Sequence, residues 1–167
     1  MAINDIKVQD VGGLASLPTT THLVSASATI IYPGEPVKLT AQSSGAATAC
    51  VKLADGDGVI GTTTQILGIA AGQSTNTASV DGTVEVFRPI QSTIFRAKAK
   101  SSTAANTAAK ITALLGAMCL IDLTSSVFTI DTAVTANTSG FQIVGGDPNT
   151  NEVFFQIRQP LLTGLVA

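Results

Sequence analysis

The stretch Ser79–Lys100, SVDGTVEVFRPIQSTIFRAKAK, carries two clear β-strand signals. Asp81-Gly82 is a dipeptide that favours a tight turn, and β-branched residues alternate with other residues directly after it. Beyond Pro89, apolar and basic residues alternate from Ile94 to Lys100 with the two-residue period of a strand. The stretch therefore predicts two β-strands and favours an all-β fold.

Similar signals recur along the rest of the chain. A turn at Pro33-Gly34 precedes Val37 and Leu39, which alternate with polar residues. Further strands are predicted in the following stretches: 50–54, 126–134, 140–146 and 152–159. Short strands separated by turn residues predict a β-sandwich or a small β-barrel.

One segment departs from the β pattern. Four apolar residues fall at helical spacing: Ala104, Ala108, Ile111 and Leu115. Ser102 or Thr103 can cap the start of a helix, and Gly116 stands where a glycine often ends one. The pattern predicts one short helix over about 103–115.

The first 25 residues differ from the body. Residues 1–25 hold a Gly-Gly pair, a proline and a threonine run without sustained periodicity. They predict an extended N-terminal arm, because a purely solvated tail would carry fewer apolar residues; a disordered terminus is the alternative. The β-rich body then spans 26–167, open to division into two β subdomains, 26–100 and 117–167, joined by the short helix.

Composition argues against several classes of protein. Only 12% of the 167 residues are charged and the net charge is −2, so the chain lacks the basic overall balance typical of a nucleic-acid-binding domain. The longest apolar stretch, Leu114–Ile121, is far shorter than the roughly 20 residues of a membrane helix. No signal peptide is recognisable. We expect a protein made in the cytoplasm that binds neither nucleic acid nor membrane, with much of its surface covered by its own copies or by a partner.

The stretch LADGDGVIG, residues 53–61, raises the question of a calcium loop. Asp55 and Asp57 match the first two ligand positions of an EF-hand, but Val59 and Ile66 stand where later oxygen ligands are needed. We interpret the stretch as a tight turn in which the aspartates accept hydrogen bonds from backbone N–H groups.

The sequence offers no convincing catalytic or metal-binding set. His22 is the one histidine and lies in the predicted arm, which provides no scaffold for a nucleophile and its base. Cys50 and Cys119 stand in apolar strand contexts without the spacing of zinc ligands, so we interpret them as buried thiols. We therefore expect no enzyme activity, no cofactor and no metal site.

Basic residues gather in the strand predicted after Pro89. If Phe95 and Ala97 face the core, then Arg96, Lys98 and Lys100 all point to the opposite side. Two interpretations stay open. The cations form a solvated face or protect a sheet edge, or they form an electrostatic docking surface for an acidic partner.

The last predicted strand, EVFFQIRQ, has Val153, Phe155 and Ile157 on its core face. Phe154 then points outward together with Arg158. An outward phenylalanine between charged residues is typical of an interface anchor, and a sheet covered on both faces would place it equally well.

Three stretches resemble the small β-rich capsid decoration, or cement, proteins of tailed bacteriophages. Those proteins have a Gly-acid-x-Val-x-Leu strand, then Ile-Leu-Gly-Ile-Ala, then Gly-x-Val-x-Val. The corresponding residues here are Gly34–Leu39, Ile66–Ala70 and Gly82–Val86. The later stretches 116–133 and 140–159 are similar to a second β portion of marine and cyanobacterial phage versions. The resemblance covers about residues 30–160 and leaves the predicted arm unmatched.

This resemblance implies a virion protein on the outer surface of an icosahedral capsid. It would clamp neighbouring major capsid protein subunits as a homo-oligomer, with a trimer favoured and a dimer open. We expect Arg96, Lys98 and Lys100 to dock on the capsid, and Phe154 and Arg158 to pack within the oligomer. The arm would add to a neighbour through five apolar residues: Ile3, Ile6, Val8, Val11 and Leu14. The alternatives are a tail or spike module, a self-assembling coat protein, or a sugar- or calcium-binding module.

Overall fold

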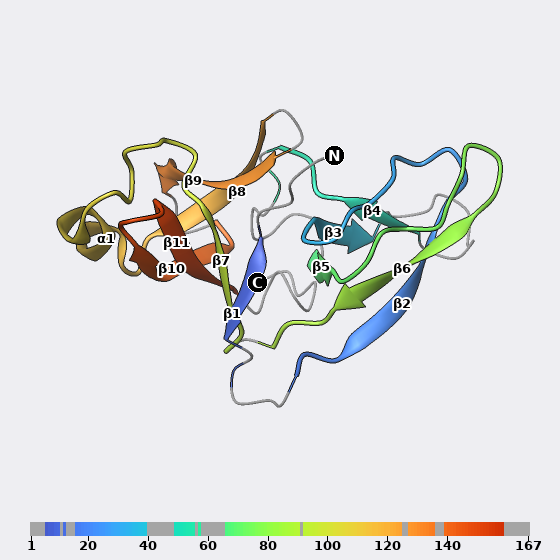
Figure 1. Ribbon diagram of the computed structural model, residues 1–167, viewed down its shortest axis with the longest axis horizontal. Coiled ribbons are helices and arrows are strands. Elements are labelled where there is room, and N and C mark those ends of the chain that lie inside the picture. Colours follow the sequence, from blue (N-terminus) through green and yellow to red (C-terminus); the bar gives the residue numbers. More distant parts are fainter. Residues whose placement is uncertain are drawn as a thin grey trace.

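The all-β prediction is confirmed: the described part of the chain forms two antiparallel sheets and one short helix (Figure 1). The computed structural model describes residues 6–10, 12, 16–39, 49–55, 57, 66–90, 92–124, 127–135 and 139–158. The six-stranded sheet has the order β1 (Lys7–Asp10), β7 (Ile94–Lys98), β11 (Glu152–Ile157), β10 (Phe141–Asp147), β8 (Met118–Thr124) and β9 (Val127–Thr135). The five-stranded sheet has the order β2 (Thr19–Val24), β6 (Gly82–Phe87), β5 (Ile66–Ala70), β3 (Pro36–Leu39) and β4 (Cys50–Lys52).

The quoted stretch Ser79–Lys100 supplies one strand to each sheet. β6 belongs to the five-stranded sheet and β7 to the six-stranded one, so the chain crosses between the sheets over 88–93. The division between sheets thus differs from the predicted subdomains, which kept 26–100 together. Figure 1 shows the two sheets on opposite sides of the molecule, with β1 and β7 on the side of the six-stranded sheet nearer to the other sheet.

Strand β5 is buried along its whole length. Its register against β3 shifts, because Val37 is opposite Gly68 while Lys38 is opposite Ile66. This bulge changes the side-chain alternation. Ile66 and Ile69 join the larger core, whereas the smaller core receives Leu67 and Ala70.

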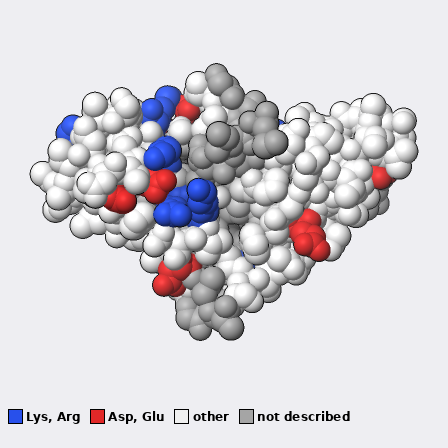
Figure 2. All heavy atoms as spheres, viewed as in Figure 1, with Lys and Arg blue, Asp and Glu red and all other residues white. Residues whose placement is uncertain are grey.

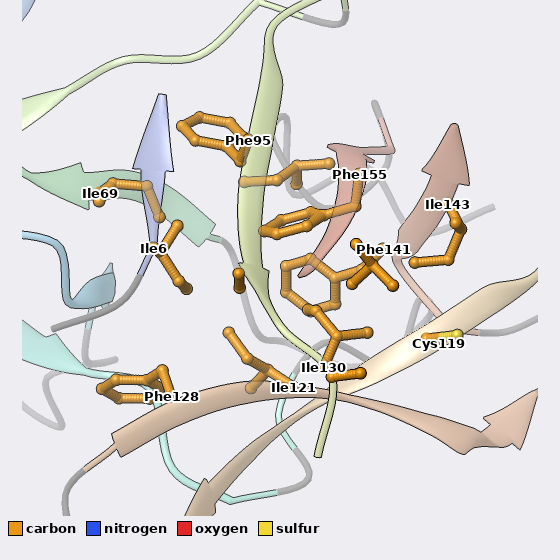
Figure 3. Packing of buried hydrophobic residues seen from close by; sticks show 14 of the residues in the cluster. Ile6, Ile69, Phe95, Cys119, Ile121, Phe128, Ile130, Phe141, Ile143 and Phe155 are labelled. Carbon is orange, nitrogen blue, oxygen red and sulfur yellow. The ribbon is translucent and has the colours of Figure 1, made fainter. Parts of the chain in front are cut away.

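The larger core joins the two sheets. Ile69 of the five-stranded sheet belongs to the same cluster as Phe95 of the six-stranded sheet (Figure 3). The rings of Phe95 and Phe155 stack with centroids 5.8 Å apart, and Phe141 meets Phe155 edge-on at 5.7 Å. Burial of each such side chain contributes roughly 1.5–3 kcal/mol, so this cluster dominates the stability of the fold.

The six-stranded sheet curls without closing into a barrel. Beyond β7, Ala99 forms a parallel bridge to Ile130 of β9, and the Lys100 N–H donates to the Ile130 carbonyl at 2.9 Å. The two strands lie far apart in the sheet order, so this short contact brings distant parts of the sheet together.

The described part of the predicted arm packs into the body. β1 pairs with β7 and β2 pairs with β6, so each sheet receives one strand from the first 24 residues. Ile6 is 2% exposed and Leu17 is 6% exposed, both within the larger core. Of the five arm residues expected to contact a neighbour, Ile6 is covered by the chain itself and Val8 packs partly buried against the same core. Ile3, Val11 and Leu14 lie outside the described residues.

The predicted helix exists but is shorter than expected. α1 spans Ala108–Leu114, and Thr107 rather than Ser102 or Thr103 caps it by accepting from the Lys110 N–H at 3.3 Å. The preceding residues are held in turns because the Ala105 N–H donates to the Asn151 side chain at 2.8 Å. Gly116 follows the helix with a φ of +80°, as a terminating glycine should.

We predict that Gly68→Ala strongly destabilises the protein. Gly68 has a φ of +154°, and an added Cβ would lie 1.9 Å from the Phe87 carbonyl oxygen, which is backbone and cannot rotate away. The expected loss is about 3 kcal/mol in the free energy of unfolding, measured by urea denaturation. Gly72→Ala is the matched control, because a Cβ there meets no atom within 4 Å. Equal stability of the two variants would contradict the close approach of the β6 backbone to Gly68.

Candidate docking surface

Arg96 and Lys98 project from the outer face of β7, as the alternation predicts. Phe95 and Ala97 are fully buried on the other face. Glu152 of β11 offsets part of this charge, since its carboxylate lies 3.8 Å from Arg96 Nη1 and 3.6 Å from Lys98 Nζ. Lys98 also donates to the Thr150 carbonyl at 2.6 Å. Both cations are partly exposed, where such ion pairs contribute little to stability.

Lys100 has a different environment from its two neighbours. Its ammonium lies 2.6 Å from Asp122 and 2.9 Å from Asp131, on β8 and β9. Burial works to raise the pKa of Asp122, but hydrogen bonds from Lys100 and Thr124 outweigh it and the net pKa is lowered. Hydrogen bonds to Asp122 and then Asp131 raise the pKa of Lys100. Lys100 therefore links the segment after β7 to β8 and β9, and its charge is already engaged within the chain.

Phe154 and Arg158 are both held by neighbouring strands. Phe154 is half-buried and stands opposite Gly145 of β10, where an added Cβ would lie 3.2 Å from the Phe154 ring. The Phe154 ring thus covers the sheet surface at Gly145, which has no side chain of its own. Arg158 Nη1 contacts the Met118 sulfur at 3.0 Å, and the backbone N–H of Arg158 donates to the Gly140 carbonyl.

These positions define one surface, which we call the β7–β11 surface. Arg96 is directly opposite Lys7 on one side and Phe154 on the other, and Lys98 is opposite Glu152. The surface comprises Lys7, Arg96, Lys98, Glu152 and Phe154. It combines an apolar ring with three cations and one anion. Figure 2 shows basic side chains gathered over this half of the molecule, while the half with the five-stranded sheet presents few charges in the same view.

The stretch around Asp55 and Asp57 is structural. Asp57 accepts from the Ala54 N–H and from Lys38 Nζ, both at 2.6 Å, as expected of an aspartate in a turn. Asp55 reaches farther and accepts from the Leu123 N–H of β8 at 3.2 Å. It therefore connects this loop to the six-stranded sheet, which the sequence did not reveal. The glycines at 56 and 58 lie outside the described residues.

Both thiols are buried, as the sequence predicted. Burial raises the pKa of Cys50 to about 12, and burial together with the charge of Asp131 raises that of Cys119 to about 11. His22 bonds to Thr20 at 2.8 Å, and burial followed by the charge of Arg88 lowers its pKa. Across the described ranges, no three His, Cys, Asp or Glu side chains come together in a way that could hold a metal ion.

Sequence reasoning missed the burial of Glu35. This carboxylate is fully buried; it accepts from the Tyr32 N–H at 2.8 Å and from Lys52 Nζ at 3.0 Å. Gly34, with a φ of +85°, completes the turn. The Pro33-Gly34 dipeptide signals this turn in the sequence, but nothing local indicates that Lys52 neutralises the acid.

Comparison with known protein families, with curated proteins and with solved structures finds no match to this chain. The helix in the described part of the chain is too short to cross a membrane.

We predict that Lys100→Gln destabilises the protein more at pH 7 than at pH 3. A lowered Asp122 pKa means that its interactions stabilise the fold above the ordinary carboxyl pKa of about 4 and are lost as the pH falls through the folded value. Lys100 stays charged throughout this window, since its pKa is raised. Thermal unfolding at both pH values measures the difference.

Lys110→Gln is the control for this experiment. Lys110 Nζ donates to two uncharged groups, the Thr103 carbonyl and the Asn106 side chain. Its effect should be similar at both pH values. A Lys100→Gln effect that is equally large at pH 3 and pH 7 would contradict the ion-pair account.

Proposed function

We propose that this chain is a non-enzymatic structural protein of a tailed-phage virion that binds the outer surface of the capsid. The supporting observation concerns the three stretches that resemble decoration proteins. They form β3, β5 and β6, which are consecutive neighbours in one sheet. Motifs scattered over about fifty residues of sequence thus build one continuous part of the fold, which favours a shared architecture over a chance similarity.

The motif residues have identifiable structural tasks. Gly34 permits the turn before β3, and the Glu35 carboxylate accepts a hydrogen bond from a backbone N–H of that turn. Gly68 allows the backbone of β6 to approach β5 closely. Substitutions there would damage the fold itself. The resemblance therefore bears on architecture, and contact with a capsid must come from surface residues.

The β7–β11 surface is the proposed contact with the major capsid protein. Arg96 and Lys98 share a single anion, Glu152, so the surface keeps a net positive charge. Phe154 supplies an apolar element beside them. A weak contact of this kind becomes effective when one copy touches several capsid subunits, because the later contacts form at high effective concentration.

The copy number in purified particles tests this proposal. A decoration protein should occur in hundreds of copies per particle, whereas a tail or spike module occurs in few. Quantitative mass spectrometry against the major capsid protein gives this ratio. A chain that is absent, or present in only a few copies, would rule out capsid decoration.

The contact itself can be tested by the double variant Arg96→Gln/Lys98→Gln. We expect its affinity for particles that lack the chain to fall about tenfold, with a weaker dependence on salt, because two cations leave the interface. Lys110→Gln removes a cation outside this surface and should bind normally. Lys100 is left intact, since its charge supports the fold. Unchanged binding and salt dependence of the double variant would exclude this surface.

A further inference from the structure

Among the described strands, β2 forms one edge of the five-stranded sheet and pairs with β6 alone. The other sheet edges within the described ranges are short or protected. β1 has four residues and a bulge, β4 has three residues, and β9 is bridged by Ala99. β2 has six residues, TTTHLV, with no bulge, proline, lysine or acid. Natural edges usually carry such protection, so an unprotected one is a ready site for strand pairing.

The pairing with β6 shows which residues of β2 direct their backbone N–H and C=O groups toward β6 and which direct them away. The Pro18 carbonyl accepts from the Arg88 N–H, so Thr20 and His22, which follow at intervals of two, direct their backbone groups toward β6. Thr21 and Leu23 therefore direct theirs away from the sheet.

The residues of β6 opposite Thr21 and Leu23 agree with this assignment. Glu85 is opposite Thr21, and its carbonyl accepts from the Ala71 N–H on the side away from β2. The Thr83 carbonyl, opposite Leu23, likewise accepts from the Thr75 N–H.

The outward backbone groups of β2 have no hydrogen-bond partner in the described part of the chain. Thr19, Thr21 and Leu23 each present an N–H and a C=O, and none of these bonds to another described residue outside the β6 ladder. The side chains of Thr19 and Thr21 are exposed. β4 approaches β2 but does not join its ladder; Val24 and Cys50 of these strands both belong to the smaller core.

We propose that β2 pairs antiparallel with β2 of a second copy, around a two-fold axis through Thr21. Thr21 is then opposite the partner's Thr21, and Thr19 is opposite the partner's Leu23. Each of the three opposed pairs exchanges two hydrogen bonds, about six in total.

Two features of β2 favour a second copy as the occupant. The pattern of outward groups is complementary to itself around Thr21. The strand also brings no net charge to the axis, since its one ionisable side chain is His22, whose pKa is lowered. A six-residue edge is small beside a standard interface of about 1,600 Å², so the dimer should be reversible. This inference does not rest on capsid binding.

Sedimentation across a range of concentrations tests the proposal with Thr21→Pro. Proline removes the outward N–H and leaves the β6 ladder intact, because edge strands tolerate proline where the N–H points away from the sheet. The wild type should move from monomer to dimer as concentration rises. The variant should keep its thermal midpoint within a few degrees and need at least about tenfold higher concentration to dimerise.

Two further variants keep the test decisive. Thr21→Val retains the N–H and should dimerise like the wild type. If Thr21→Pro fails to fold, Thr21→Lys keeps the backbone and places two like charges at the axis, which should weaken dimerisation to a similar extent. A wild type that stays monomeric up to millimolar concentration, a wild type that forms a trimer, or a Thr21→Pro or Thr21→Lys variant that dimerises unchanged would each overturn the proposal.

Discussion

The bulge of β5 is the constraint on which the two sheets depend. Without it, simple alternation would separate Ile66 and Ile69 onto opposite faces. The bulge turns both toward the larger core and leaves Leu67 and Ala70 for the smaller one. One strand therefore supplies both clusters, and the backbone of β6 approaches so closely that only glycine fits at 68. Since the larger core also contains the phenylalanines of the other sheet, this single irregularity helps to hold the whole molecule together.

Much of the charge that this chain carries is engaged within it. Lys38 pairs with Asp57, Lys52 with Glu35, and Lys100 with two aspartates. Because these lysines are already paired with carboxylates of the same chain, they attract an external acidic surface less than their number suggests. The proposed associations would then depend more on shape, on the apolar ring of Phe154 and on the backbone groups at the β2 edge than on long-range attraction. The low proportion of charged residues in the sequence also favours contacts that depend little on charge.

Features set by neighbouring residues were predictable, and those set by distant ones were not. The alternation in β7 and β11 is local, so the core faces of both strands followed from the sequence. The start of α1 did not, because Asn151 competes for the residues before it. The counter-charge of Arg96 and Lys98 depends on the register between β7 and β11, which no local pattern contains. The pairing of β1 with β7, next to which Ile6 is buried within its own chain, is likewise a long-range contact.

A protein that clamps a shell needs two contacts that point in different directions. The β7–β11 surface lies on the six-stranded sheet and the free edge of β2 lies on the five-stranded sheet. The larger core fixes the relation between the sheets, so contact made through one sheet positions the other. A copy bound to a capsid subunit would then hold its β2 edge at a defined place. Two such copies on adjacent subunits would pair at an effective concentration far above that in solution, which lets a weak edge contact link neighbouring subunits.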